Sequence, residues 1–163
     1  MNRNILIFCL TITILLSSST ASWSDDFQKG VYASQKGEYA TAIKAWTPLA
    51  EKGDADAQYA LGAMYFAGYG VSQDYQTAMK WYTLAAEQGN ALAQFNLDVI
   101  YHKGHGVLQD HARAYMWFNL SVSTGHEVAF KVRDIVAEQM TPSEIEQAQK
   151  LAEECIAKNY NGC

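Results

Sequence analysis

A 36-residue unit occurs twice in succession in the middle of the chain. Shifting the first copy, Asp54–Gly89, by 36 positions places it on the second copy, Asn90–Gly125. A fixed period of this size is typical of solenoids, in which each unit completes its core only against its neighbours. The two copies share the following identical pairs, among others: Ala57/Ala93, Gln58/Gln94, Leu61/Leu97, Tyr65/Tyr101, Gly68/Gly104, Gly70/Gly106, Asp74/Asp110 and Trp81/Trp117.

Each copy reads as two helices joined by a short loop. Gln58, Leu61 and Tyr65 recur at i, i+3 and i+7, which is one face of a helix, and Ala78 and Trp81 begin a second such face. The intervening Gly-Tyr-Gly-Val-Ser-Gln-Asp loop begins with glycines that suit a helix C-cap and ends on an aspartate that suits an N-cap. The predicted fold class is therefore all-α, an α/α solenoid of helix pairs.

At these residues the chain resembles the Sel1-like repeat, a relative of the tetratricopeptide repeat. The shared pattern is A-x-A-Q-x-x-L-G-x-x-Y-x-x-G-x-G-V-x-x-D-x-x-x-A-x-x-W-Y-x-x-A-A-x-x-G, and residues 54–89 follow it almost throughout. Residues 90–125 depart from it at Asp98, where the pattern has glycine, and at Ser121-Val122, where it has two alanines. The resemblance implies a superhelix that binds proteins or peptides on its inner surface, and it implies no catalytic residues.

The segments on either side extend the array. Residues 25–53 resemble a tetratricopeptide helix pair, with a turn at Gly37 and an expected interruption of the second helix at Pro48. Residues 126–163 read as a lone helix followed by a capping helix. That last helix is expected to start at a capping box formed by Thr141 and Glu144, with Pro142 at its first position.

Residues 1–21 have the character of a secretory signal peptide. A short positive region precedes the apolar run Ile5–Leu16, which is too short to span a membrane, and Ser19 and Ala21 provide a small-x-small cleavage site near Ala21. The alternative is a buried N-terminal helix. We expect a secreted or periplasmic protein that is not inserted in the membrane after cleavage. The formal net charge of −5 argues against a nucleic-acid partner.

Two cysteines follow the signal segment, which itself contains Cys9. Cys155 and Cys163 form an even pair in an expected secreted protein, which favours an intramolecular disulfide. Two free thiols or an intermolecular bond are the alternatives.

Motifs for catalysis are missing from the sequence. Some secreted, cysteine-rich members of this family are linked to β-lactam binding or hydrolysis, but no serine here is followed by lysine three residues later. Neither His-Glu-x-x-His nor Gly-x-Ser-x-Gly occurs. The chain is expected not to be an enzyme, and a cell-wall-active or β-lactam-binding enzyme is the alternative.

The histidines and tryptophans are expected to be structural. No metal and no other cofactor is predicted, because three of the four histidines replace Phe66, Tyr69 and Tyr75 of the first copy. Trp81 and Trp117 are expected in the core rather than on a carbohydrate platform. The four histidines are His102, His105, His111 and His126.

The inner surface is the predicted binding site. If the first helix of each pair lines the concave side, one aromatic recurs at the same place in three successive units. The alternative is that so short a solenoid buries some of these residues against its own cap. The predicted contacts are Phe27, Val31, Tyr59, Ala63, Phe66, Phe95, Val99 and His102.

Asp98 is the substitution that conflicts most with the pattern. A buried carboxylate needs water or a cation, so we expect it to lie opposite Ala114 and to pair with Arg113 or Arg133. The sequence as a whole predicts a monomeric extracytoplasmic adaptor that holds a protein or peptide of the cell envelope in its groove.

Overall fold

The computed structural model describes residues 25–123, 133–134 and 136–163. A helix over residues 25–35 precedes the labelled helices, residues 133–134 and 136–137 are also helical, and the described residues contain no strand. The labelled helices are α2 (Tyr39–Glu51), α3 (Ala55–Ala67), α4 (Tyr75–Glu87), α5 (Ala91–Lys103), α6 (His111–Ser123) and α8 (Pro142–Ala157).

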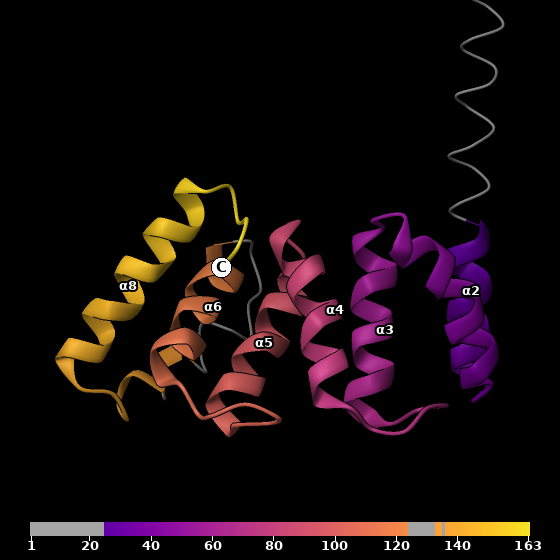
Figure 1. The fold of residues 1–163 in the computed structure, drawn as a ribbon, viewed down its shortest axis with the longest axis horizontal. Helices are drawn as coiled ribbons and strands as arrows, with labels where there is room; N and C mark the ends of the chain where they lie inside the picture. Colours follow the sequence, from indigo (N-terminus) through magenta and orange to yellow (C-terminus); the bar gives the residue numbers. More distant parts are fainter. Residues whose placement is uncertain (1–24, 124–132, 135) are drawn as a thin grey trace, which may run out of the picture.

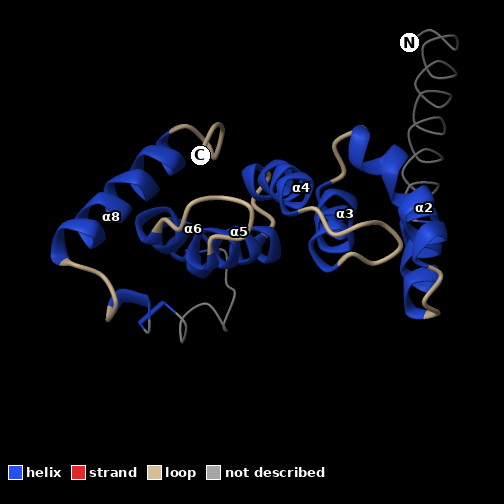
Figure 2. Cartoon of the chain, turned by 60° about the horizontal axis from the view of Figure 1, so that its bottom comes forward, coloured by secondary structure: helices blue, strands red, loops and turns tan. Residues whose placement is uncertain are grey.

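The helices stand in one row in chain order, and each packs against the next (Figures 1 and 2). Within each 36-residue repeat the pairs α3–α4 and α5–α6 make the most extensive contacts. The all-α solenoid predicted from the period is confirmed. The predicted signal segment, Cys9, His126 and most of the expected lone helix lie outside the described residues.

The loops inside the repeats also join each repeat to the unit before it. Gly70 and Gly106 have φ of 73°, and a Cβ on either would lie 2.7 Å from the Cβ of Tyr39 or 2.8 Å from that of Tyr75. Tyr69 stacks on Tyr39 at a centroid distance of 4.8 Å. Its counterpart His105 stacks on Tyr75 at 4.7 Å. The glycines are needed because side chains would push these joints apart.

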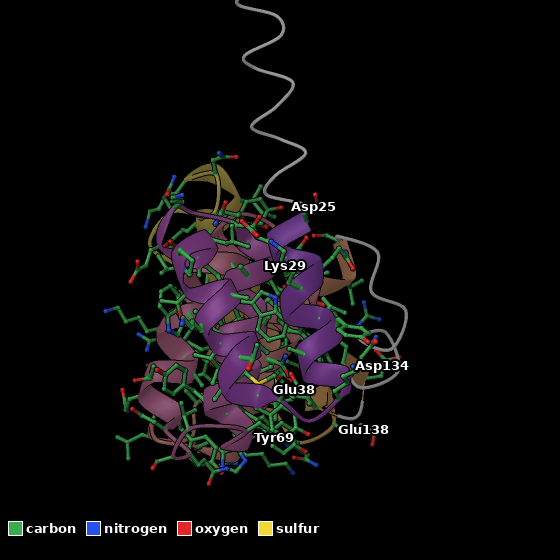
Figure 3. All side chains as sticks on the ribbon, turned by 90° about the vertical axis from the view of Figure 1, so that its right-hand side faces the viewer. Asp25, Lys29, Glu38, Tyr69, Asp134 and Glu138 are labelled. Atoms are coloured by element: carbon green, nitrogen blue, oxygen red, sulfur yellow. A yellow bond between two sulfur atoms is a disulfide. The ribbon has the colours of Figure 1, made fainter. Side chains whose placement is uncertain are left out.

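Both loops lie along the same edge of the row, the lower one in Figure 1. Figure 3 views the row from its N-terminal side and shows Tyr69 and Glu38 toward that lower edge, with Asp25 near the upper edge. The caps take the predicted form. Asp74 accepts hydrogen bonds from the backbone amides of Gln76 and Thr77, and Gly68 adopts the left-handed C-cap conformation.

A buried glutamine links each repeat by a hydrogen bond to the helix before it. The side-chain nitrogen of Gln58 donates to the Ala50 carbonyl at 3.0 Å, and that of Gln94 donates to the Ala86 carbonyl at 3.2 Å. Both carbonyls belong to the last turn of the preceding helix, and each also accepts a backbone N–H, from Gly53 at 3.0 Å and from Gly89 at 2.9 Å. The repeated glutamine therefore adds a side-chain hydrogen bond between each repeat and the helix before it.

Small residues set the distance between paired helices. A Cβ on Gly62 would lie 2.6 Å from the ring of Tyr82, so this glycine permits the close packing of α3 on α4. Trp117 is 1% exposed, as expected for a core tryptophan, whereas Trp81 is half-buried against the core of the first units.

The C-terminal helix covers the end of the array. The capping box of Thr141 and Glu144 is formed and Pro142 opens α8, as predicted. Cys155 and Cys163 are joined by a disulfide, which confirms the predicted pairing. The tail then reaches beyond α8, because the backbone nitrogen of Gly162 donates to the Glu87 side chain on α4 at 2.8 Å.

Two expectations about individual residues are wrong. α2 runs through Pro48 without interruption. The carbonyl that proline leaves without an amide partner belongs to Lys44, and both residues are exposed, so solvent can satisfy it. Asp98 is 2% exposed, but its expected partners pair elsewhere. The guanidinium of Arg113 lies 3.6 Å from Asp110 and that of Arg133 lies 2.9 Å from Asp134.

The carboxyl of Asp98 is buried and short of hydrogen-bond partners. Its Oδ1 is buried and has no hydrogen-bond partner within the described part of the chain. Burial raises the pKa of Asp98 to about 8, with a small opposing effect from Lys103. A Cβ on its counterpart Gly62 would lie 2.6 Å from the ring of Tyr82, and the residue equivalent to Tyr82 in the second repeat is Phe118.

Candidate functional site

A groove opens on the first two helix pairs and reaches the start of α5. Its volume is about 370 Å³, within the range of pockets that hold small ligands or side chains. Four of the eight predicted contacts lie in it. The groove is lined by Phe27, Val31, Trp46, Asp56, Tyr59, Ala60, Ala63, Met64, Asn90 and Leu92.

The sequence period explains why these side chains meet. Phe27 and Tyr59 come from the first helices of successive units, residues 25–35 and α3. Between them the indole of Trp46 lies at a ring-centroid distance of 6.0 Å from Phe27 and donates from Nε1 to the Phe27 carbonyl at 3.1 Å. Because the indole nitrogen is satisfied internally, the walls of the groove are left almost wholly apolar.

The rim of the groove is polar where α5 begins. Asn90, the N-cap of α5, donates from Nδ2 to the Asp56 carboxylate at 3.1 Å. Leu92 stands beside it with 43% of its surface exposed. An exposed leucine next to a carboxylate gives the groove one apolar and one anionic contact at the same edge.

The remaining predicted contacts lie elsewhere along the array. Phe66 packs edge-on against Tyr75 at 5.3 Å and against His105 at 5.8 Å, in the joint between the two repeats. Phe95 lies 5.9 Å from Phe118 and packs on the cluster that also receives α8. The structure therefore does not bring Phe95 together with Tyr59 in one groove.

The last two predicted contacts, Val99 and His102, are half-buried on α5. The ring of His102 lies 5.5 Å from that of His111, in the same edge-on arrangement as Phe66 and Tyr75 one repeat earlier. Burial, Lys103 and His111 together lower the pKa of His102. Both histidines have a buried Nδ1 without a hydrogen-bond partner among the described residues.

Other groove residues were not singled out from the sequence. They are Trp46, Asp56, Ala60, Met64, Asn90 and Leu92. Leu92 follows Asp56 by 36 positions, so both occupy the first turn of the first helix in their repeats. That shared register is the signal that could have placed both at the groove rim.

The described residues were expected to hold no metal, and they form no cluster suited to one. No group of three or more His, Cys, Asp or Glu side chains in that part of the chain is arranged to hold a metal ion. Among the same residues no helix combines the length and the apolar character that crossing a membrane requires.

Comparisons with known proteins agree with this architecture. The family model for the Sel1 repeat matches residues 55–90 and 91–126. A protective antigen of uropathogenic Escherichia coli strains, which displays an SLR fold, is 28% identical with a TM-score of 0.79, over 88% of this chain and 32% of its own. No curated protein matches the chain.

A second solved structure is a Sel1 repeat protein from Oxalobacter formigenes, which is 29% identical with a TM-score of 0.64. This match covers 71% of the present chain and 49% of the other. The chain thus spans about a third of the first structure and half of the second.

Proposed function

Because the chain carries two Sel1 repeats, a type of repeat that generally builds scaffolds for protein interactions, we propose that it binds a partner protein or peptide in the groove. The observation that carries this proposal is the almost wholly apolar lining that Phe27, Tyr59 and Leu92 present to solvent. Apolar depressions on otherwise polar surfaces commonly mark partner sites.

The groove fits an apolar side chain of the partner as its anchor. A few buried aromatic or aliphatic anchors commonly supply most of the energy of an interface. Asp56 at the rim accepts a hydrogen bond from Asn90 and is exposed, so it favours a basic or amide group next to that anchor.

We place this activity outside the cytoplasm and assign it to a monomer. The signal-like segment at residues 1–21 and the Cys155–Cys163 disulfide support that location, since disulfides persist in oxidising compartments. The partner would then be a protein or peptide of the cell envelope. No catalytic role is included in the proposal, because the sequence contains no Ser-x-x-Lys, His-Glu-x-x-His or Gly-x-Ser-x-Gly motif.

Tyr59→Ala tests the proposal directly. Partners recovered from a cell-envelope extract on the wild-type chain should bind the variant at least about tenfold more weakly, since 1.4 kcal/mol corresponds to a factor of ten. The control is Leu84→Ala, which removes an exposed apolar side chain that does not line the groove.

Melting temperatures separate binding from folding. Tyr59 is half-buried and lies 5.9 Å from Tyr82, so the variant should remain folded at the binding temperature, by circular dichroism. The proposal fails if Tyr59→Ala binds every recovered partner like the wild type, or if Leu84→Ala weakens binding equally.

A further inference from the structure

A second pocket lies on the second repeat, away from the groove. Its volume is about 530 Å³, and its walls come from α4, α5, the α5–α6 loop and the start of α6. It shares no lining residue with the groove. We call it the loop pocket, and the residues that matter to its chemistry are Met79, Tyr101, Val107, Leu108, Asp110 and Arg113.

The apolar side of the loop pocket is unusually open. Leu108 is 91% exposed, the highest value among the large apolar side chains that the structure describes as exposed. It follows Val107 in a loop whose ends are fixed by the αL cap at Gly104 and by Asp110 at the start of α6. Because the ends of the loop are already held, a partner that covers Leu108 has to order its side chain but does not have to order the ends of the loop.

The polar side of the loop pocket is formed by the guanidinium of Arg113, which lies against Tyr101 and Asp110. The Cζ of Arg113 lies 5.7 Å from the centroid of the Tyr101 ring. Its Nε lies 3.6 Å from Asp110, whose other oxygen accepts the Arg113 backbone amide at 2.9 Å. Within the described residues the two terminal nitrogens of Arg113 make no hydrogen bond, so their four N–H donors have no partner there, and the side chain is 54% exposed.

The first repeat shows that neither feature is required by the fold. The residues equivalent to Leu108 and Arg113 are Ser72 and Thr77. The hydroxyl of Thr77 donates to the Asp74 carboxylate at 2.7 Å. Threonine is uncharged, so the first repeat has no cation at this position. The second repeat thus differs from the first by an added cation and an added apolar side chain at one pocket.

We propose that the loop pocket binds the C-terminal residue of a polypeptide, with the carboxylate on Arg113 and an apolar side chain against Val107 and Leu108. A planar guanidinium pairs with a carboxylate through two parallel hydrogen bonds. A C-terminal residue carries its carboxylate and its side chain on the same Cα, so one small pocket can hold both. An internal acidic side chain with an apolar neighbour would need contacts spread over two residues.

Two short peptides that differ only at their end test this assignment. The probes are acetyl-Gly-Ser-Gly-Leu with a free carboxylate and the same peptide as its C-terminal amide, each titrated into isotope-labelled full chain and followed by NMR. We expect the free acid to shift the amide resonances of residues 107, 108 and 113, and the amide form to bind at least about tenfold more weakly.

Variants taken from the first repeat sharpen the test. Arg113→Thr should weaken binding of the free acid at least about tenfold, and Leu108→Ser should weaken it severalfold. Lys150→Thr on α8 removes the same charge from an exposed site outside the loop pocket, and it should bind like the wild type.

The proposal is overturned if the acid and the amide bind equally, or if Arg113→Thr binds the acid like Lys150→Thr does. Shifts confined to groove residues around Tyr59 would also overturn it, because they would assign the peptide to the groove. Dispersed spectra of the variants before titration exclude unfolding as the cause of any loss.

Discussion

Asp98 offers a quantitative test of how the second repeat departs from the first. The carboxyl is 2% exposed, its Oδ1 lacks a partner among the described residues, and burial raises its pKa from 3.8 to about 8. The folded chain therefore holds this proton more tightly than the unfolded chain between those two pKa values. Stability from this group is greatest below pH 4 and is lost as the pH rises toward 8.

The size of the effect follows from the shift. Each pH unit within this window corresponds to about 1.4 kcal/mol, so at pH 7 the group costs on the order of 4 kcal/mol relative to its protonated form. Any water that reaches the carboxyl reduces this figure. Asp98→Asn keeps the shape of the side chain and cannot ionise, so it should be more stable than the wild type at pH 7 by up to that amount.

Urea unfolding of both proteins at pH 5, 6, 7 and 8 measures the difference. The advantage of Asp98→Asn should grow with pH at up to about 1.4 kcal/mol per unit, while other titrating groups, including His102, act equally in both proteins. Asp98→Gly, which restores the residue of the first repeat, should not lower the melting temperature at pH 7. Two stability curves that run parallel from pH 5 to 8 would refute the reasoning.

Two further predictions concern the core and the tail. Trp81→Ala should destabilise the fold by about 3 kcal/mol, because its indole fills space between the first units, and a melting temperature within one or two degrees of the wild type would contradict this. Reducing the disulfide should cost about 2–3 kcal/mol for a loop closed between Cys155 and Cys163 and should speed hydrogen exchange at the end of α8, with the repeats unchanged. Hydrogen exchange at the end of α8 should be as fast in Cys155→Ser as in the reduced protein. Two free thiols found by mass spectrometry in the oxidised protein would show that the disulfide does not form.

Much of the fold could be predicted because the signals for helix caps and turns are local. The turn glycine Gly68, the N-cap Asp74 and the capping box at Thr141 each act within a few residues, so sequence spacing alone locates them. The continuation of α2 through Pro48 could not be predicted in this way. It depends on whether the freed carbonyl reaches solvent, which is set by the packing of the whole pair.

The binding surface was less predictable than the fold. Register alone suggested that Tyr59 and Phe95 line one groove. Phe95 lies 5.9 Å from Phe118 just as Tyr59 lies 5.9 Å from Tyr82, but Phe95 also packs on the core cluster that includes α8 residues and does not line the groove. Conversely, Trp46 reaches the groove from a second helix, which a rule based on first helices excludes. Which side chains meet across units depends on helix packing over many residues, and periodicity does not report it.

Photo-crosslinking from the groove rim tests the central claim most directly. A photoreactive amino acid would replace Leu92, which is 43% exposed at the rim, and in a second protein Leu84, which is 38% exposed and does not line the groove. We predict a discrete crosslinked partner from position 92 in the cell envelope, lost when Tyr59→Ala is added, and none from position 84. Equal crosslinking from both positions, or a position-92 product that persists with Tyr59→Ala, would contradict the assignment of partner binding to this groove.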